Sequence, residues 1–240
     1  MRKLILVPVI HGAADLGSGA AAAEQKGVAL CGEERWRKHQ QTITAFWATL
    51  ADYFGRVDAA HLRIYQDGLV AEGEIGMKIV KDAASKGSMN YQIISSLVAR
   101  GAAIRKTEDL SLVKAELDHV IRIVRAKSAA RRAWAGLCYK LHQGRLLRRR
   151  DGFVARTIAD TLRPGEVGVL FVGAHHDVLS RLPADIKVCQ LKDRQELLAY
   201  QRALLSRGQA TRFEELAASI SAPLEPPKAD TRLSPGAPGR

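Results

Sequence analysis

The chain has 240 residues, of which 47% are hydrophobic, and it carries a formal net charge of +12. This length and apolar content suffice for a domain with a sizeable core, and no apolar run approaches the roughly 18–20 residues that a membrane-spanning helix needs. The positive charge favours anionic partners such as phosphates, nucleic acid or a membrane surface. The three cysteines lack both metal-ligand spacing and the density of a secreted disulfide scaffold, so we expect a cytoplasmic protein.

The first half of the chain alternates between predicted strands and helices. Lys3–Ile10 is aliphatic and predicts a buried strand. The two basic residues at the start of the chain, followed by apolar ones, also resemble a signal peptide. We favour the strand, because the apolar run is short and polar residues follow it at once. Gly12–Gly32 is rich in Gly and Ala with little periodicity, and predicts a long loop that has room for a short helical piece. Periodicity and turn residues then predict a helix, a strand, two helices and a strand over Arg35–Phe54, His61–Gln66, Glu74–Lys86, Met89–Arg100 and Ala102–Lys106.

The second half begins with a long helical and increasingly basic region, Leu110 to about Leu147, which Gly136 and Gly144 are expected to interrupt. A separate amphipathic helix is expected over Asp151–Leu162, before the Pro164-Gly165 turn. The remaining pattern predicts two strands and a helix over Val167–Val172, Ile186–Leu191 and Arg194–Ser206.

Strands that alternate with helices indicate an α/β fold with a mainly parallel central sheet flanked by helices. We expect residues 1–220 to form a single domain of this kind. From residue 221 onward the composition changes, because five of the eight prolines lie there and apolar residues become scarce. Residues 221–240 are therefore expected to be a disordered, proline-rich tail.

In parallel sheets, ligands bind beyond the carboxyl ends of the strands. Each predicted strand is followed by a short polar segment, and these segments should converge on one rim of the sheet. The segments supply histidines and carboxylates, namely His11, Asp67, Glu108, Asp109, His175 and His176. Several of these also have a structural interpretation, because turns and helix starts commonly use Asp, Glu and His.

Imidazole and carboxylate groups are the ligands of many divalent metals, and they are also general bases for hydrolysis. A metal such as Mn, Zn or Fe would be bound by His11, Asp67 and His176 and would activate a water molecule. Without a metal, one histidine or carboxylate would deprotonate water directly. The spacing leaves both alternatives open, because the chain has neither HExxH nor paired CxxC motifs. Of the adjacent pair His175 and His176, whose side chains must point differently, we expect His176 to be the functional one.

Two segments carry a resemblance to a known family. Arg150–Leu162, followed by the strand VGVLFV and then Gly173-Ala-His-His176 with a downstream Leu-Pro, resembles the C-terminal GxxH motif of TraB/Tiki-type proteins. Pro8-Val-Ile-His11 is similar to the family's other GxxH motif, with Pro in place of Gly, and Asp67 is the nearest match to its acid after the second strand. Asp151 stands where that family usually has Asn. Erythromycin-esterase and ChaN-like proteins share this layout.

The resemblance implies an α/β fold with a His/acid centre that serves metal-dependent peptidases, esterases or haem-binding proteins. We therefore predict a hydrolase that acts on a small-molecule or peptide-like substrate. Its catalytic residues would be His11, Asp67, Glu108, Arg150 and His176. Arg150, together with Asp109 and His175, would contact the substrate, because a guanidinium suits an anionic group or a developing oxyanion.

Two alternatives use other chemistry. From Lys127 to Arg150 the chain has eight Lys or Arg and no Asp or Glu, so a non-catalytic protein could bind nucleic acid or acidic partners through this segment. The chain shows no recognisable nucleic-acid-binding motif, and the run is also typical of a solvated helix face. The second alternative is a haem-binding or other ligand-binding protein that uses the same histidines. The sequence leaves the oligomeric state open.

Overall fold

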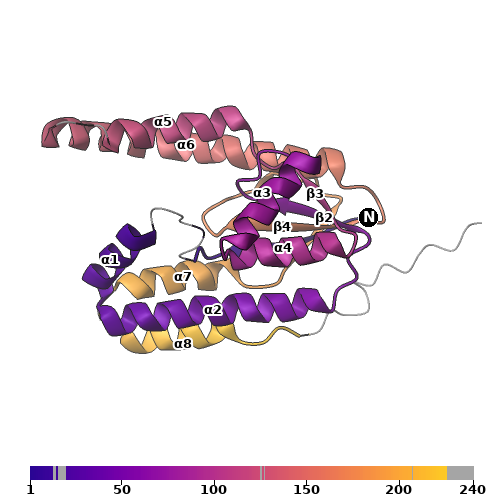
Figure 1. Ribbon diagram of the computed structural model, residues 1–240, viewed down its shortest axis with the longest axis horizontal. Helices are drawn as coiled ribbons and strands as arrows, with labels where there is room; N and C mark the ends of the chain where they lie inside the picture. Colours follow the sequence, from indigo (N-terminus) through magenta and orange to yellow (C-terminus); the bar gives the residue numbers. More distant parts are fainter. Residues whose placement is uncertain (13–14, 16–19, 125, 127, 207, 226–240) are drawn as a thin grey trace, which may run out of the picture.

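The computed structural model describes residues 1–12, 15, 20–124, 126, 128–206 and 208–225 (Figure 1). Within these residues, five parallel strands form one sheet in the order β3-β2-β4-β1-β5. The strands are β1 (Arg2–Val9), β2 (Leu62–Gln66), β3 (Ala103–Arg105), β4 (Val167–Gly173) and β5 (Ile186–Gln190). The predicted α/β class with a parallel sheet is confirmed.

Helices connect the strands and cover the sheet. They are α1 (Ala20–Cys31), α2 (Glu33–Gly55), α3 (Gly73–Ser85), α4 (Met89–Ala99), α5 (Leu110–Val124), α6 (Ala129–Thr161), the short 3₁₀ helix η2 (Leu179–Arg181), α7 (Arg194–Leu205) and α8 (Ala210–Ser221). In the part of the chain that the structure describes, none of these helices is long and apolar enough to cross a bilayer.

The two faces of the sheet are covered unequally. Because side chains alternate along a strand, Val7 of β1 faces one side and Leu6 faces the other. The face with Val7 packs against the larger core, to which α2, α4, α7 and α8 contribute Phe46, Trp47, Leu97, Tyr200 and Phe213. The face with Leu6 packs against the second half of α6 through Val154, Ala155 and Ile158, and against Leu162, which directly follows that helix. One helix therefore forms most of the second layer.

Among the described residues, the first half of α6 packs against α5 and no strand lies beneath it (Figure 1). α6 has 33 residues, which corresponds to roughly 50 Å of helix. Figure 1 shows this half beside α5 in a hairpin that extends beyond the rest of the domain. Tyr139 donates its hydroxyl hydrogen to Glu116 of α5 at 3.2 Å, which links the two helices.

The loop predicted over Gly12–Gly32, with at most a short helical piece, gives way in its second part to α1, a helix of 12 residues. Alanine has the highest helix propensity, and this segment is rich in it. Gly27 lacks apolar side-chain area but is essential to the packing, because a Cβ there would lie 2.4 Å from the ring of Trp36. Most of the first part, residues 13–14 and 16–19, lies outside the described residues.

The predicted interruption of the long helical region is also wrong. Gly136 and Gly144 lie within a continuous α6, and no new helix starts at Asp151. A single glycine costs a helix only about 1 kcal/mol, which the packing of the neighbouring turns can offset. The helical region divides instead before Ser128, whose hydroxyl accepts the N–H of Arg131 at 3.3 Å and caps α6.

The end of the domain extends slightly further than expected. α8 was not predicted, although Phe213, Leu216, Ala217 and Ile220 bury one side of it in the larger core. Ser221 still belongs to this helix, and the carbonyl of Ala222 accepts a hydrogen bond from Lys192 at 2.6 Å. The rest of the predicted tail, residues 226–240, lies outside the described residues.

Two glycines in helix interiors should respond to alanine in opposite directions. At Gly76 of α3, a Cβ would lie 2.6 Å from the backbone oxygen of Ala71 and 2.8 Å from Ile104, whereas at Gly136 none of the described side chains lies within 4 Å. We expect Gly76→Ala to lower the free energy of unfolding by about 1–3 kcal/mol through overpacking. Gly136→Ala should raise it by up to about 1 kcal/mol. Urea denaturation measures both, and equal effects would contradict the packing described for α3.

Candidate functional site

Three neighbouring strands bring the candidate residues together. β4 lies between β2 and β1, so the residues that follow these strands, Asp67, His176 and His11, share one edge of the sheet. The N–H of Asp67 donates to the carbonyl of Phe171 at 2.9 Å, which continues the pairing of β2 with β4 up to the site. The indole N–H of Trp47 donates to the carbonyl of Ile10 at 3.1 Å and fixes the backbone before His11. The predicted convergence at this edge is confirmed for these three residues.

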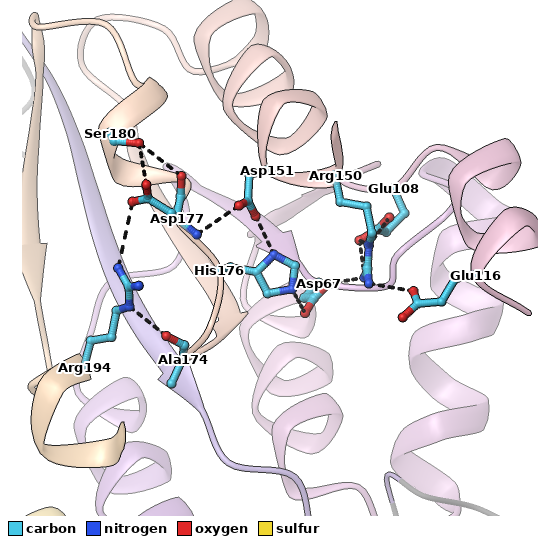
Figure 2. Close-up of polar contacts among 10 residues, drawn as sticks. All are labelled: Asp67, Glu108, Glu116, Arg150, Asp151, Ala174, His176, Asp177, Ser180 and Arg194. Carbon is cyan, nitrogen blue, oxygen red and sulfur yellow. Dashed lines mark hydrogen bonds and ion pairs between the residues drawn. The ribbon is translucent and has the colours of Figure 1, made fainter. Parts of the chain in front are cut away.

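His176 is held between two carboxylates (Figure 2). Its Nδ1 lies 2.6 Å from Oδ1 of Asp151, and its Nε2 lies 3.3 Å from Oδ2 of Asp67. The other oxygen of Asp151 accepts the N–H of Asp177 at 3.0 Å. The ring is only 8% exposed, so its position is set by α6 on one side and by the end of β2 on the other.

These contacts keep the imidazole charged. Burial by itself would lower the pKa of His176, but the hydrogen bonds and negative charges of Asp151 and Asp67 outweigh it and raise the pKa to about 9. Burial would likewise raise the pKa of Asp67, yet its contacts with His176 and Arg150 hold that pKa well below its usual range. At neutral pH, His176 and Asp67 therefore form a buried ion pair.

Arg150 binds the second oxygen of Asp67. Its Nη2 lies 2.8 Å from Oδ1 of Asp67 and 2.7 Å from Glu108, and its Nη1 lies 3.0 Å from Glu116. Glu108 is fully buried, and burial raises the pKa of its carboxyl against the opposing effect of Arg150. Because the carboxylates of Asp67, Glu108 and Glu116 all bind the guanidinium group of Arg150, this side chain holds the three acids in place. These contacts do not favour the predicted role of holding an anionic substrate group.

A cavity of about 450 Å³ opens beside this network. Asp67, Arg150 and His176 lie in its wall, and Glu116, Leu146 and Leu147 of the α5–α6 hairpin close one side. His11 and His175 also line the cavity and are both exposed. His11 has Asp15 near it, with 3.9 Å between Nδ1 and Oδ2, and Asp15 itself accepts hydrogen bonds from Gly12 and Ser88.

One predicted residue lies elsewhere and two were missed. Asp109, a predicted substrate contact, accepts the N–H and hydroxyl of Ser111 at 2.8 and 2.7 Å and lines a different cavity. Asp151 and Glu116 contact His176 and Arg150 but were not among the predicted site residues. Asp151 directly follows Arg150 in the motif that carries the family resemblance, so its position was a signal. Glu116 gave no such signal.

The arrangement does not fit the metal ion that the resemblance implies. Asp67 and His176 lie side by side, but each already has a charged partner, and Asp67 is bound by Arg150. Among the described residues, no three His, Cys, Asp or Glu side chains are placed to hold one ion. What the network offers chemically is an acid and a base in contact at the wall of a cavity.

Comparison with known proteins gives no relative. No protein-family model, curated protein or solved structure matches the chain. The fold class therefore depends on the structure alone, and the resemblance to TraB/Tiki-type proteins stays a prediction.

The ion pair of His176 should make stability depend on pH. Because its folded-state pKa of about 9 exceeds the value of about 6.5 in an unfolded chain, the stabilisation is fully present below about pH 6.5. It is lost as the pH rises through about 9, and amounts to the order of 3 kcal/mol. Urea denaturation across this range measures it. His176→Gln should lack this component, and an unchanged pH dependence in that variant would contradict the assignment.

Two adjacent arginines of α6 provide a matched test of the network. Arg150→Gln leaves the buried Glu108 without its cation and removes one of the two cations of Asp67, and should lower the free energy of unfolding by about 3–5 kcal/mol. Arg149→Gln changes an exposed residue and should stay within about 0.5 kcal/mol of the parent. Combining Arg150→Gln with Glu108→Gln should recover part of the loss. Similar stabilities for both single variants would show that the three carboxylates do not depend on Arg150.

Proposed function

We propose that the chain is a hydrolase that cleaves a small or peptide-like ester or amide in the cavity, with His176 as general acid and Asp67 as general base. The observation that carries this proposal is the contact of 3.3 Å between Nε2 of His176 and Oδ2 of Asp67 in the cavity wall. Neighbouring titratable groups whose environments push their pKa values apart are candidates for an acid and base pair.

His176 supplies the proton for the leaving group. Asp151 binds Nδ1 at 2.6 Å and fixes the ring, so that the proton on Nε2 is the one available to a substrate. A pKa of about 9 keeps this proton in place at neutral pH. Transfer to the departing oxygen or nitrogen lets that atom leave as a neutral group.

Asp67 accepts a proton from the attacking water. Arg150 binds Oδ1 of Asp67, so Oδ2, which lies 3.3 Å from Nε2 of His176, is the oxygen that accepts this proton. The water oxygen bonds to the carbonyl carbon, the bond to the leaving atom breaks, and the leaving atom takes the proton of Nε2. Asp67 then passes the proton that it gained from water to His176 across the 3.3 Å contact, which restores both groups.

The other predicted residues have supporting roles in this proposal. His11 and His175 are exposed on the cavity wall and would contact the substrate. Arg150, with Glu108, positions Asp67. The same residues carry the likeness to TraB/Tiki-type proteins, and membership of that family is part of the proposal.

Histidine variants test the assignment on p-nitrophenyl acetate and on a panel of fluorogenic peptides. On the peptides, whose amine leaving groups need a proton, we expect His176→Gln to lower kcat by about 10²- to 10⁴-fold, because it removes the general acid. The ester should respond less, because p-nitrophenolate leaves without a proton. His61→Gln, which changes an exposed histidine before β2, is the control and should leave kcat unchanged. The activity of the parent should fall as the pH rises through about 9, where His176 loses its proton.

Metal analysis and absorbance distinguish the alternatives. Activity that EDTA abolishes and Mn²⁺ or Zn²⁺ restores would replace the acid–base pair by metal-dependent hydrolysis. A haem absorbance band in the purified protein would favour the ligand-binding alternative. Full activity of His176→Gln would overturn the proposal directly.

A further inference from the structure

Three large apolar side chains are exposed on the projecting half of α6. Trp134, Leu137 and Leu141 are 69%, 49% and 72% exposed. Spacings of three and four residues place them on one side of the helix. Single exposed apolar residues need no explanation, but an aligned set that includes a tryptophan is a candidate interaction surface.

Arginines continue the same side toward the sheet. Arg145 follows Trp134 by about three helical turns, and Arg148 follows Leu141 by about two. Arg156 follows Arg145 by about three more turns. We call this set, Trp134, Leu137, Leu141, Arg145, Arg148 and Arg156, the outer face of α6.

The arginines of the outer face have no charge partner among the described residues. Arg148 and Arg156, together with Arg149 and Arg181, line a cavity of about 320 Å³. No ion pair or side-chain hydrogen bond joins these four guanidinium groups to an acid in the described part of the chain. Asp109, the acid in that cavity, is bound to Ser111. Residues 129–150 contain no Asp or Glu.

We propose that the outer face of α6 docks on a membrane surface that contains anionic lipids. The tryptophan and leucines would enter the interface between headgroups and acyl chains, and the arginines would bind the headgroup phosphates and carboxylates. Helices with apolar residues on one side and flanking Lys or Arg are suited to lie in this interface, and clustered arginines add electrostatic attraction to an anionic leaflet.

Charge and chemistry favour lipid over the other occupants. The arginines could bind the phosphates of a nucleic acid, but the two exposed leucines would make no specific contact with it. A single tryptophan also cannot stack several successive bases. A second copy of the same face would bring like charges together, which is repulsive. An anionic lipid surface is complementary to both halves of the outer face.

Docking in this way leaves the cavity of the candidate site accessible. Arg150 follows Leu141 by nine residues, which is half a turn out of phase, so the side of α6 that lines the cavity faces away from the membrane. The proposal does not depend on the chain being a hydrolase.

Vesicle sedimentation with the full chain tests the proposal. We expect binding to phosphatidylcholine vesicles that contain about 30% phosphatidylserine, and at least about tenfold weaker binding to pure phosphatidylcholine. Arg145→Gln and Arg148→Gln should each weaken binding about fivefold. Arg212→Gln, which removes the same charge from α8 on the other side of the sheet, should leave binding unchanged.

Apolar variants and fluorescence test the other half of the surface. Leu141→Ser should also weaken binding, while its exposure means that folding, followed by circular dichroism, is retained. Vesicles should shift the tryptophan emission to shorter wavelength, and Trp134→Phe should abolish the shift.

Several results would overturn the proposal. These are no binding to either vesicle, equal binding to both, or a reduction by Arg212→Gln as large as that by Arg148→Gln. Binding of a labelled RNA or duplex DNA without vesicle binding would assign the outer face to nucleic acid. Self-association that Leu141→Ser abolishes, again without vesicle binding, would assign it to a second copy.

Discussion

The carboxylate of Asp67 is the group on which the site depends. One of its oxygens binds Arg150 and the other lies 3.3 Å from His176, so it joins the end of β2 to α6 and to the turn after β4. Buried charges are tolerated only when they are paired, and here each cation is shared between carboxylates. The position of α6 over the sheet, and with it one wall of the cavity, is therefore tied to the same ionic contacts that set the protonation of His176.

The sequence was sufficient to predict which strand ends carry the site, but not the contacts between them. Parallel strands deliver their following residues to one edge whatever the strand order, which is why His11, Asp67 and His176 could be grouped in advance. That Asp67 and His176 touch follows from β4 lying beside β2, and strand order is decided by packing over the whole sheet. Asp151 lies inside a helix where no turn or strand end marks it. Its place directly after Arg150 in the motif was a signal in the sequence, but only the folded chain shows that it contacts His176.

The helices and loops that the sequence predicts incorrectly share one physical cause. In each case, tertiary packing overrides the local conformational preference of the residues. Gly27 reads as a loop residue in isolation, yet it is the residue that lets Trp36 pack against α1. Gly136 and Gly144 are tolerated because α6 is stabilised along its length, by α5 at one end and by the sheet at the other. α8 has a clear buried side, but its amphipathic pattern is short, and the helix is stabilised by packing against the larger core.

The basic segment illustrates why net charge does not specify a function. In the sequence, Arg145, Arg148 and Arg150 belong to one uninterrupted positive run. In the fold they divide by helical phase, since Arg150 lies partly buried among three carboxylates while Arg145 and Arg148 stay on the outer face. One arginine of α6 therefore holds the carboxylates of the site in place, while other arginines of the same helix face solvent or a partner. Which arginine does which is fixed by the position of Asp67, Glu108 and Glu116 on other elements, so the division exists only in the folded chain.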